Sequence, residues 1–114
     1  MSENPQFPEL QSTVAKYLTT PKGELSVALD EVFASDAVVH DDGHTHIGID
    51  AIAAWTNEVA AAFTFTRTVI SVIVQPNAAI VAVLVKGDFP GSPVELHHHF
   101  SLTGDRIAAL TICT

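Results

Sequence analysis

The residue pattern changes type near Phe63, and this change limits the folds open to the chain. Before it, apolar residues mostly recur every three or four positions, as they do along one side of a helix. After it, residues 64–75 are dominated by Thr, Val, Ile and Phe, whose side chains crowd a helix but suit a pleated sheet. Helices first and strands last predict an α+β fold with the helices packed on one face of a curved sheet.

Three helices are predicted in the first part of the chain. The first begins near Pro8, and the second follows Thr20-Pro21, a good N-cap and first-turn pair. The third covers residues 51–62 after Asp50. Their apolar stripes are Phe7, Leu10, Val14, Tyr17 and Leu18 in the first, Leu25, Ala28, Leu29, Val32 and Phe33 in the second, and Ile52, Trp55, Val59 and Phe63 in the third. Asp36 is expected just past the end of the second helix.

Turn residues divide the rest of the chain into strands. Asp42-Gly43 predicts a short hairpin between residues 37–41 and 44–48. Further turns separate strands expected over the ranges 64–75, 78–89, 94–102 and 106–113. These last four strands form a mainly antiparallel, strongly curved sheet. Because 114 residues suit one domain of ordinary size, one domain is expected over residues 1–114.

Charge and hydropathy exclude several classes of function. Five Lys and Arg against thirteen Asp and Glu give a net charge of −8, which is a poor match to nucleic acid or anionic lipid. The longest apolar run, residues 78–85, is far shorter than the roughly 20 residues that span a bilayer. Residues 1–10 lack the basic cluster and apolar block of a secretory signal. We therefore expect a cytoplasmic protein with no nucleic-acid or membrane partner.

Histidines gather in residues 40–46 and 95–99. Strand alternation places His98 on an apolar face with Leu96 and Phe100, and it places His97 and His99 on the opposite face. Paired imidazoles could chelate zinc, copper or iron, but no acidic ligand matches them, so no metal is expected and a metal enzyme is the weaker alternative. Cys113 is expected to be a small apolar filler of the last strand.

The chain has no nucleophile elbow and no Gly-rich phosphate loop. The functions that remain are acid–base chemistry in a pocket and ligand binding without catalysis.

Two stretches carry a resemblance to a known family. Residues 33–41 (FASDAVVHD), followed by Gly48 and then residues 52–55 (IAAW), resemble the signature of SnoaL-like and ketosteroid-isomerase-like proteins of the nuclear transport factor 2-like superfamily. Residues 98–110 look like the C-terminal hairpin of that family. The resemblance implies a single SnoaL-like domain with a cone-shaped interior. It also implies a homodimer formed through the exposed sheet face.

The resemblance further implies roles for individual residues. Tyr17 resembles the helix-one Tyr of ketosteroid isomerases and Asp41 resembles their carboxylate base, whereas the inward position of the family's protonated Asp holds His98. A carboxylate beside an apolar cone can move a proton next to a carbonyl while a phenol or imidazole donates a hydrogen bond to the enolate oxygen. Five apolar residues are expected to bind the ligand as pocket wall or to belong to the core: Phe33, Trp55, Phe63, Leu96 and Phe100.

Two functions follow as expectations. The first is isomerase-like or cyclase-like proton transfer on a small hydrophobic carbonyl compound, without a cofactor, with Asp41 as the base and Tyr17 or His98 as donors. The second is a non-catalytic module of the same fold that binds a small molecule or forms a dimer. Fold alone does not choose between them, because this superfamily hosts many activities.

Overall fold

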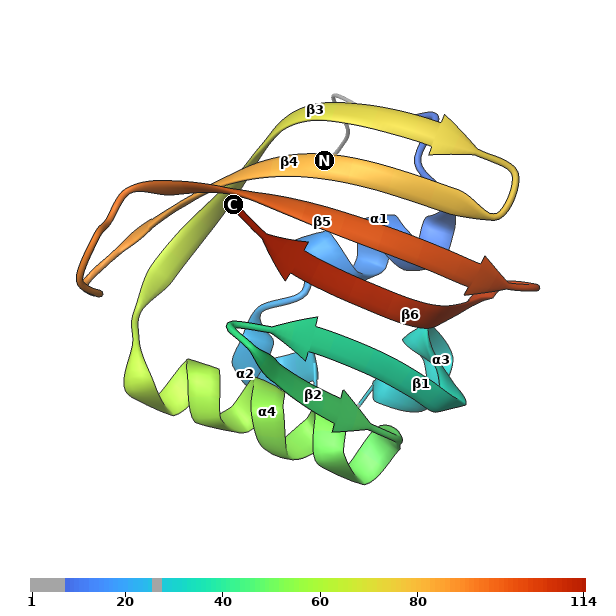
Figure 1. Ribbon diagram of the computed structural model, residues 1–114, viewed down its shortest axis with the longest axis horizontal. Helices are drawn as coiled ribbons and strands as arrows, with labels where there is room; N and C mark the ends of the chain where they lie inside the picture. The colour runs from blue at the N-terminus through green and yellow to red at the C-terminus, as the bar shows by residue number, and fades with distance from the viewer. Residues whose placement is uncertain (1–7, 26–27) are drawn as a thin grey trace.

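The computed structural model describes residues 8–25 and 28–114, in which four helices lie on one side of a six-stranded sheet (Figure 1). The strands are β1 (Phe33–Asp41), β2 (His44–Ile47), β3 (Phe65–Gln75), β4 (Ala78–Gly87), β5 (Val94–Thr103) and β6 (Arg106–Cys113). The helices are α1 (Ser12–Thr19), α2 (Lys22–Leu25), α3 (Leu29–Val32) and α4 (Ile49–Ala62). The predicted fold class, α+β with helices on one face of a curved sheet, is confirmed.

The helices differ from the prediction in their ends. α1 begins at Ser12 instead of near Pro8, and Phe7 lies outside the described residues. The predicted second helix is two separate four-residue helices, α2 and α3, and Phe33 and Asp36 belong to β1. Ala28 has a non-helical backbone, with φ −119° and ψ 13°, so the single helix that the apolar stripe predicts is interrupted there. No helix in the described part of the chain is long and apolar enough to cross a bilayer.

The hairpin between β1 and β2 forms where Asp42-Gly43 predicts it. Both turn residues have positive φ, 54° at Asp42 and 77° at Gly43. This is the backbone of the tight turn that matches the twist of two antiparallel strands, and Asp and Gly adopt it readily. The turn places Asp41 at the very end of β1, next to β2.

The sheet order is β2-β1-β6-β5-β4-β3, with β1 and β6 parallel and every other neighbouring pair antiparallel. Irregularities in register interrupt β1, β3 and the pairing of β5 with β6. Such bulges bend a strand and increase its twist. The sheet consequently curves around α1 and the short helices, and α4 packs against β1, β2 and α2 at one end (Figure 1).

The inner face of the sheet and the helices share one apolar core. Alternating residues of β4 point inward, with Val81 and Val83 fully buried, while Ile80 and Lys86 face out. On β5 the same alternation buries His98 and Phe100 and leaves His99 exposed, as the sequence predicts. The largest fully buried side chains come from helices and sheet alike: Tyr17, Phe33, Phe100, Leu25, Leu29, Ile52, Ile107 and Leu110.

Replacement of Gly87 by Ala tests the close approach of β3 to the end of β4. A Cβ at this position would lie 2.2 Å from the Thr64 carbonyl oxygen and 2.6 Å from the Phe65 Cβ. Because backbone and a β-carbon cannot move aside cheaply, we expect Gly87→Ala to lower the free energy of unfolding by about 3 kcal/mol. Urea denaturation measures the change.

Gly104→Ala is the control for this prediction. Gly104 has φ 59° but nothing within 4 Å of an added Cβ, so only the left-handed backbone opposes the substitution, at about 1 kcal/mol. Equal losses in the two variants would contradict the steric explanation for Gly87.

Candidate functional site

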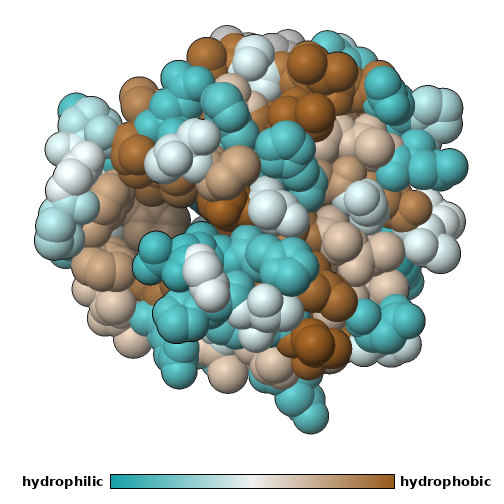
Figure 2. All heavy atoms as spheres, in the orientation of Figure 1, coloured by the Kyte–Doolittle hydropathy of each residue, from teal (hydrophilic) through white to brown (hydrophobic). Residues whose placement is uncertain are grey.

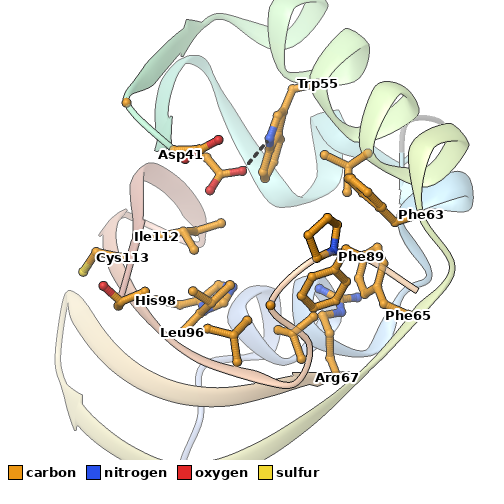
Figure 3. Close-up of a pocket in the computed structure, with 18 residues that line it drawn as sticks. Asp41, Trp55, Phe63, Phe65, Arg67, Phe89, Leu96, His98, Ile112 and Cys113 are labelled. Atoms are coloured by element: carbon orange, nitrogen blue, oxygen red, sulfur yellow. Dashed lines mark hydrogen bonds between the residues drawn. The ribbon is translucent and has the colours of Figure 1, made fainter. Parts of the chain in front are cut away.

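A cavity of about 740 Å³ opens between α4, the β1–β2 turn, the loop before β5 and the ends of β5 and β6. Figure 2 shows the corresponding hollow in the surface, with hydrophobic side chains inside it. Its wall is mainly apolar and includes Val59, Phe63, Phe65, Phe89, Leu96 and Ile112. The lining also contains ionisable residues, among them Asp41, His98 and Arg67 (Figure 3).

Asp41 is held in place by α4. The Trp55 indole Nε1 donates a hydrogen bond to Asp41 Oδ2 over 3.0 Å, and Trp55 itself is only 4% exposed (Figure 3). The His46 ring stacks on Trp55 with a centroid distance of 5.8 Å and an interplanar angle of 27°. The Asp41 carboxylate is therefore oriented at the cavity wall by the Trp55 indole, which is itself buried and packed against His46 of β2.

His98 faces the cavity from the middle of the sheet. In the register, Asp41 of β1 and His98 of β5 both pair with Ile112 of β6, so they lie on the same inward row. Two strand spacings separate their backbones by roughly 10 Å, which leaves room for a small ligand between the side chains. The His98 ring stacks on Phe100 with a centroid distance of 6.1 Å.

Tyr17 lies behind this wall instead of in it. Its side chain is fully buried and is not part of the cavity lining. The ring packs edge-on against Phe33 and Phe100, at 5.9 and 5.7 Å, and lies 6.3 Å from the His98 ring. Burial raises the pKa of the phenol well above its ordinary value of 10.0; the Arg67 charge opposes this rise in pKa, and the Asp41 charge adds to it.

Arg67 is the functional candidate that the sequence analysis missed. It lies on β3, donates from Nη2 to the Thr20 carbonyl oxygen over 2.7 Å, and places its guanidinium 5.5 Å from the centre of the Tyr17 ring. Burial lowers its pKa, and Tyr17 acts in the opposite direction. Alternation could have found it, since Arg67 falls between Phe65 and Val69 on the apolar face of its strand.

Comparison with known proteins places the chain in a family. The sequence profile of the SnoaL-like domain matches residues 14–110. The chain belongs to the SnoaL-like family. A comparison with functionally curated proteins gives no match.

Solved structures agree with this assignment. A protein of Sinorhizobium meliloti, named as a candidate polyketide cyclase, is 36% identical with a TM-score of 0.87 over 95% of this chain and 99% of its own. A Catenulispora acidiphila protein with a ketosteroid isomerase-like fold, solved with trimethylamine, is 18% identical with a TM-score of 0.77 over 90% and 85%. A candidate SnoaL-like polyketide cyclase from a Jannaschia species is 15% identical with a TM-score of 0.76 over 98% and 90%. The last two support the fold alone.

The structure separates the pocket wall of this SnoaL-like domain from its core. Of the five apolar residues expected to bind ligand, Trp55, Phe63 and Leu96 line the cavity. Phe33 and Phe100 are 1% and 2% exposed and lie in the core beside Tyr17. Phe33 begins β1, whereas the cavity is at the other end of that strand, where Asp41 lies. The catalytic and binding roles of all these residues stay predictions.

The clustered histidines of the SnoaL-like domain lie on different faces of the sheet. His40 is exposed and its Nδ1 lies 3.0 Å from Thr45 Oγ1, while His97 forms an exposed pair with Glu95 at 3.1 Å. Within the described residues, no group of three or more His, Cys, Asp or Glu side chains could hold a metal ion. Cys113 is exposed at the end of β6, so its expected role as a buried filler is wrong. It pairs with outward-facing His97, so the register turns it away from the core, although it is still one of the residues that line the cavity.

The buried phenol of Tyr17 predicts an unusual alkaline titration of this SnoaL-like domain. Because Tyr17 is the chain's single tyrosine and its pKa is raised, no tyrosinate should form near pH 10 while the fold persists. The unfolded chain loses this proton above pH 10.0, so stability should fall as the pH rises beyond that value, by about 1.4 kcal/mol per pH unit. Ultraviolet difference spectroscopy and urea denaturation follow the two effects.

Tyr17→Phe is the matched control, since it keeps the ring and removes the titrating hydroxyl. The free energy of unfolding of this variant should not show the decrease above pH 10.0 that ionisation of Tyr17 in the unfolded chain causes. Formation of tyrosinate in the native protein near pH 10 would contradict the burial argument.

Proposed function

We propose that the cavity binds a small apolar carbonyl compound and that Asp41 moves a proton on the carbon next to the carbonyl group. His98 donates a hydrogen bond to the carbonyl oxygen. Tyr17, one layer deeper, packs against the His98 ring and supports its orientation. The reaction class is isomerase-like or cyclase-like proton transfer that needs no cofactor.

The hydrogen bond from Trp55 to Asp41 at the cavity wall carries this proposal. A general base must be held where it can reach the proton it removes, and its carboxylate needs a free lone pair for that proton. The indole occupies Oδ2 of Asp41, and the half-buried carboxylate stands beside an apolar cavity. A carboxylate that precedes a turn could instead cap that turn. The hydrogen bond from Trp55 and the position beside the cavity support the role of a positioned base better.

Residues of the site account for the proton and the electron pair at each stage of the reaction. Asp41 takes the proton from the carbon, the C–H electron pair forms the enolate, and negative charge develops on the oxygen beside His98. The protonated carboxyl then returns the proton to another carbon, which completes an isomerisation. Alternatively, the enolate carbon attacks a second carbonyl of the same molecule. A C–C bond forms, the π electron pair of that carbonyl moves onto its oxygen, and the protonated Asp41 returns its proton to the resulting alkoxide, which completes a cyclisation. The 36% identical Sinorhizobium meliloti protein, named as a candidate polyketide cyclase, supports this second outcome.

Asp41→Asn tests the base. Asn keeps the size of Asp and an oxygen that accepts the Trp55 hydrogen bond, so the fold should persist. We expect wild-type protein to accelerate deuterium incorporation next to the carbonyl of β-tetralone, an apolar bicyclic ketone, in deuterium oxide. The variant should lose about 10²- to 10⁴-fold of that rate, as measured by proton NMR.

Asp36→Asn is the control for this prediction, because Asp36 is an exposed carboxylate on the same strand, outside the cavity lining. It should keep the wild-type rate. Full activity of Asp41→Asn would overturn the role of the base. The chain's single tryptophan, Trp55, reports binding independently through its fluorescence. If β-tetralone changes that fluorescence and no exchange occurs, the domain is a binding module and the proton-transfer proposal fails.

We also propose that two copies pair through the outer face of the sheet. The helices cover only the inner face, and on the outer face Ile73 and Ile80 are cross-strand neighbours that are 60% and 39% exposed. The chain has thirteen carboxylates, yet Glu95 is the sole carboxylate at the outward positions of β3–β6, all of which the structure describes. For a protein of net charge −8, this is the face on which a second copy meets the least repulsion.

Ile73→Glu tests this interface. We expect wild-type protein to sediment with twice the mass of one chain, and the variant to sediment as a monomer, because a carboxylate in the middle of the contact is desolvated without a partner. Ala54→Glu, on an exposed position of α4, should stay dimeric. A monomeric wild-type protein at the concentrations used for binding would refute the proposal.

A further inference from the structure

Arg67 places a positive charge in the wall of an apolar cavity, and no carboxylate of the described residues forms an ion pair with it. Among the described residues, its guanidinium makes one hydrogen bond, to the Thr20 carbonyl oxygen, and no ion pair. The Nη1 atom is shielded from solvent and has no hydrogen-bond partner among these residues. The guanidinium also lies over the face of the Tyr17 ring, 5.5 Å from its centre.

Other cations in the described structure have ordinary surroundings. Lys16 pairs with Glu31 on the surface, and Arg106 pairs with Asp105 and donates to the Asp30 carbonyl oxygen. Lys86 is exposed on the outer face of β4. Arg67 differs from these three because it is largely buried, forms no ion pair within the described part of the chain and lines the cavity.

Such an arrangement opposes folding unless something balances it. A guanidinium stays charged under all ordinary conditions, and removing it from water without an ion-pair partner is strongly unfavourable. Its contacts with Thr20 and Tyr17 recover only part of this cost, since a carbonyl and a ring face do not neutralise the charge. The fork of N–H donors suits a carboxylate, which can accept two hydrogen bonds and cancel the charge together.

We propose that Arg67 binds a carboxylate of the ligand, so that the cavity selects apolar compounds that also carry an acid group. This inference rests on the proposed function in that the cavity is a ligand site, and it narrows the substrate class from apolar carbonyl compounds to apolar keto acids. Arg67 is a specificity-determining residue in this account.

The position of Arg67 also sets the orientation of such a ligand. Figure 3 shows Asp41 and Arg67 on opposite sides of the cavity, and His98 of β5 also faces it. Asp41 repels a carboxylate and Arg67 attracts it, so the acid group lies toward β3 and the uncharged end of the ligand lies toward α4 and Asp41. The reacting carbon is then the one remote from the acid group, beside the base.

Binding of a matched acid and amide tests the proposal. Phenylbutyrate and its primary amide have the same shape and differ in charge, and isothermal titration calorimetry measures both at neutral pH. We expect wild-type protein to bind the acid at least tenfold more tightly than the amide, because a charge-assisted pair is lost in the amide. Arg67→Gln should reduce this preference to about one, and Arg67→Lys should retain part of it.

Lys86→Gln is the charge-matched control. It removes one positive charge from the neighbouring strand on the opposite face of the sheet, so its preference for the acid should equal that of wild type. The comparison of the two compounds on wild-type protein needs no variant, so it remains decisive if Arg67→Gln fails to fold.

The outcomes separate this proposal from the one on which it rests. Equal binding of acid and amide to wild type would overturn it and leave Arg67 as a support for the Thr20 carbonyl, while the cavity would still be a ligand site. Binding of neither compound would also overturn it. In that case the fluorescence of Trp55 with β-tetralone would show separately whether the cavity takes any apolar carbonyl compound.

Discussion

The cavity depends on the parallel pairing of β1 with β6. This pairing joins the first strand of the chain to the last, and it sets Asp41 and His98 on either side of Ile112 on one inward row. After β1 the chain turns into β2 at the edge of the sheet, and α4 follows β2 and crosses the end of the sheet. Trp55 can donate to Asp41 only because that helix returns over β1. A single strand pairing thus places the base, the imidazole and the hydrogen bond that orients the base.

Tyr17 connects this site with the core. Its ring packs against Phe33 and Phe100 of the core and also lies next to His98 and Arg67, which line the cavity. Close packing of a large buried ring restricts the side chains around it to a few rotamers. The residues with polar chemistry are therefore supported by the same contacts that stabilise the fold. This makes the site rigid on its sheet side, while the wall formed by the loop before β5 and the end of α4 supplies the apolar surface.

Much of the architecture follows from local pattern. Alternation of apolar residues in residues 94–102 predicts that His98 is buried and His99 exposed, and both are found so. Asp42-Gly43 predicts the hairpin because few other residue pairs adopt its positive φ values easily. The same reasoning fails for the second predicted helix. An unbroken apolar stripe predicts one helix there, whereas α2 and α3 are separate. It also misplaces Cys113, since the end of a strand can point outward without any change in composition.

The sequence by itself determines the α+β class, the strand order along the chain and the face on which most side chains lie, because these depend on spacings of two to four residues. It also carries enough of the family pattern to single out Asp41, Tyr17 and His98. Only the tertiary structure decides that Tyr17 is behind the cavity wall, that Trp55 and Phe63 line the cavity while Phe33 and Phe100 fill the core, and that Arg67 faces the cavity. These outcomes depend on sheet curvature and on contacts between residues far apart in the chain. Local spacing holds no information about either.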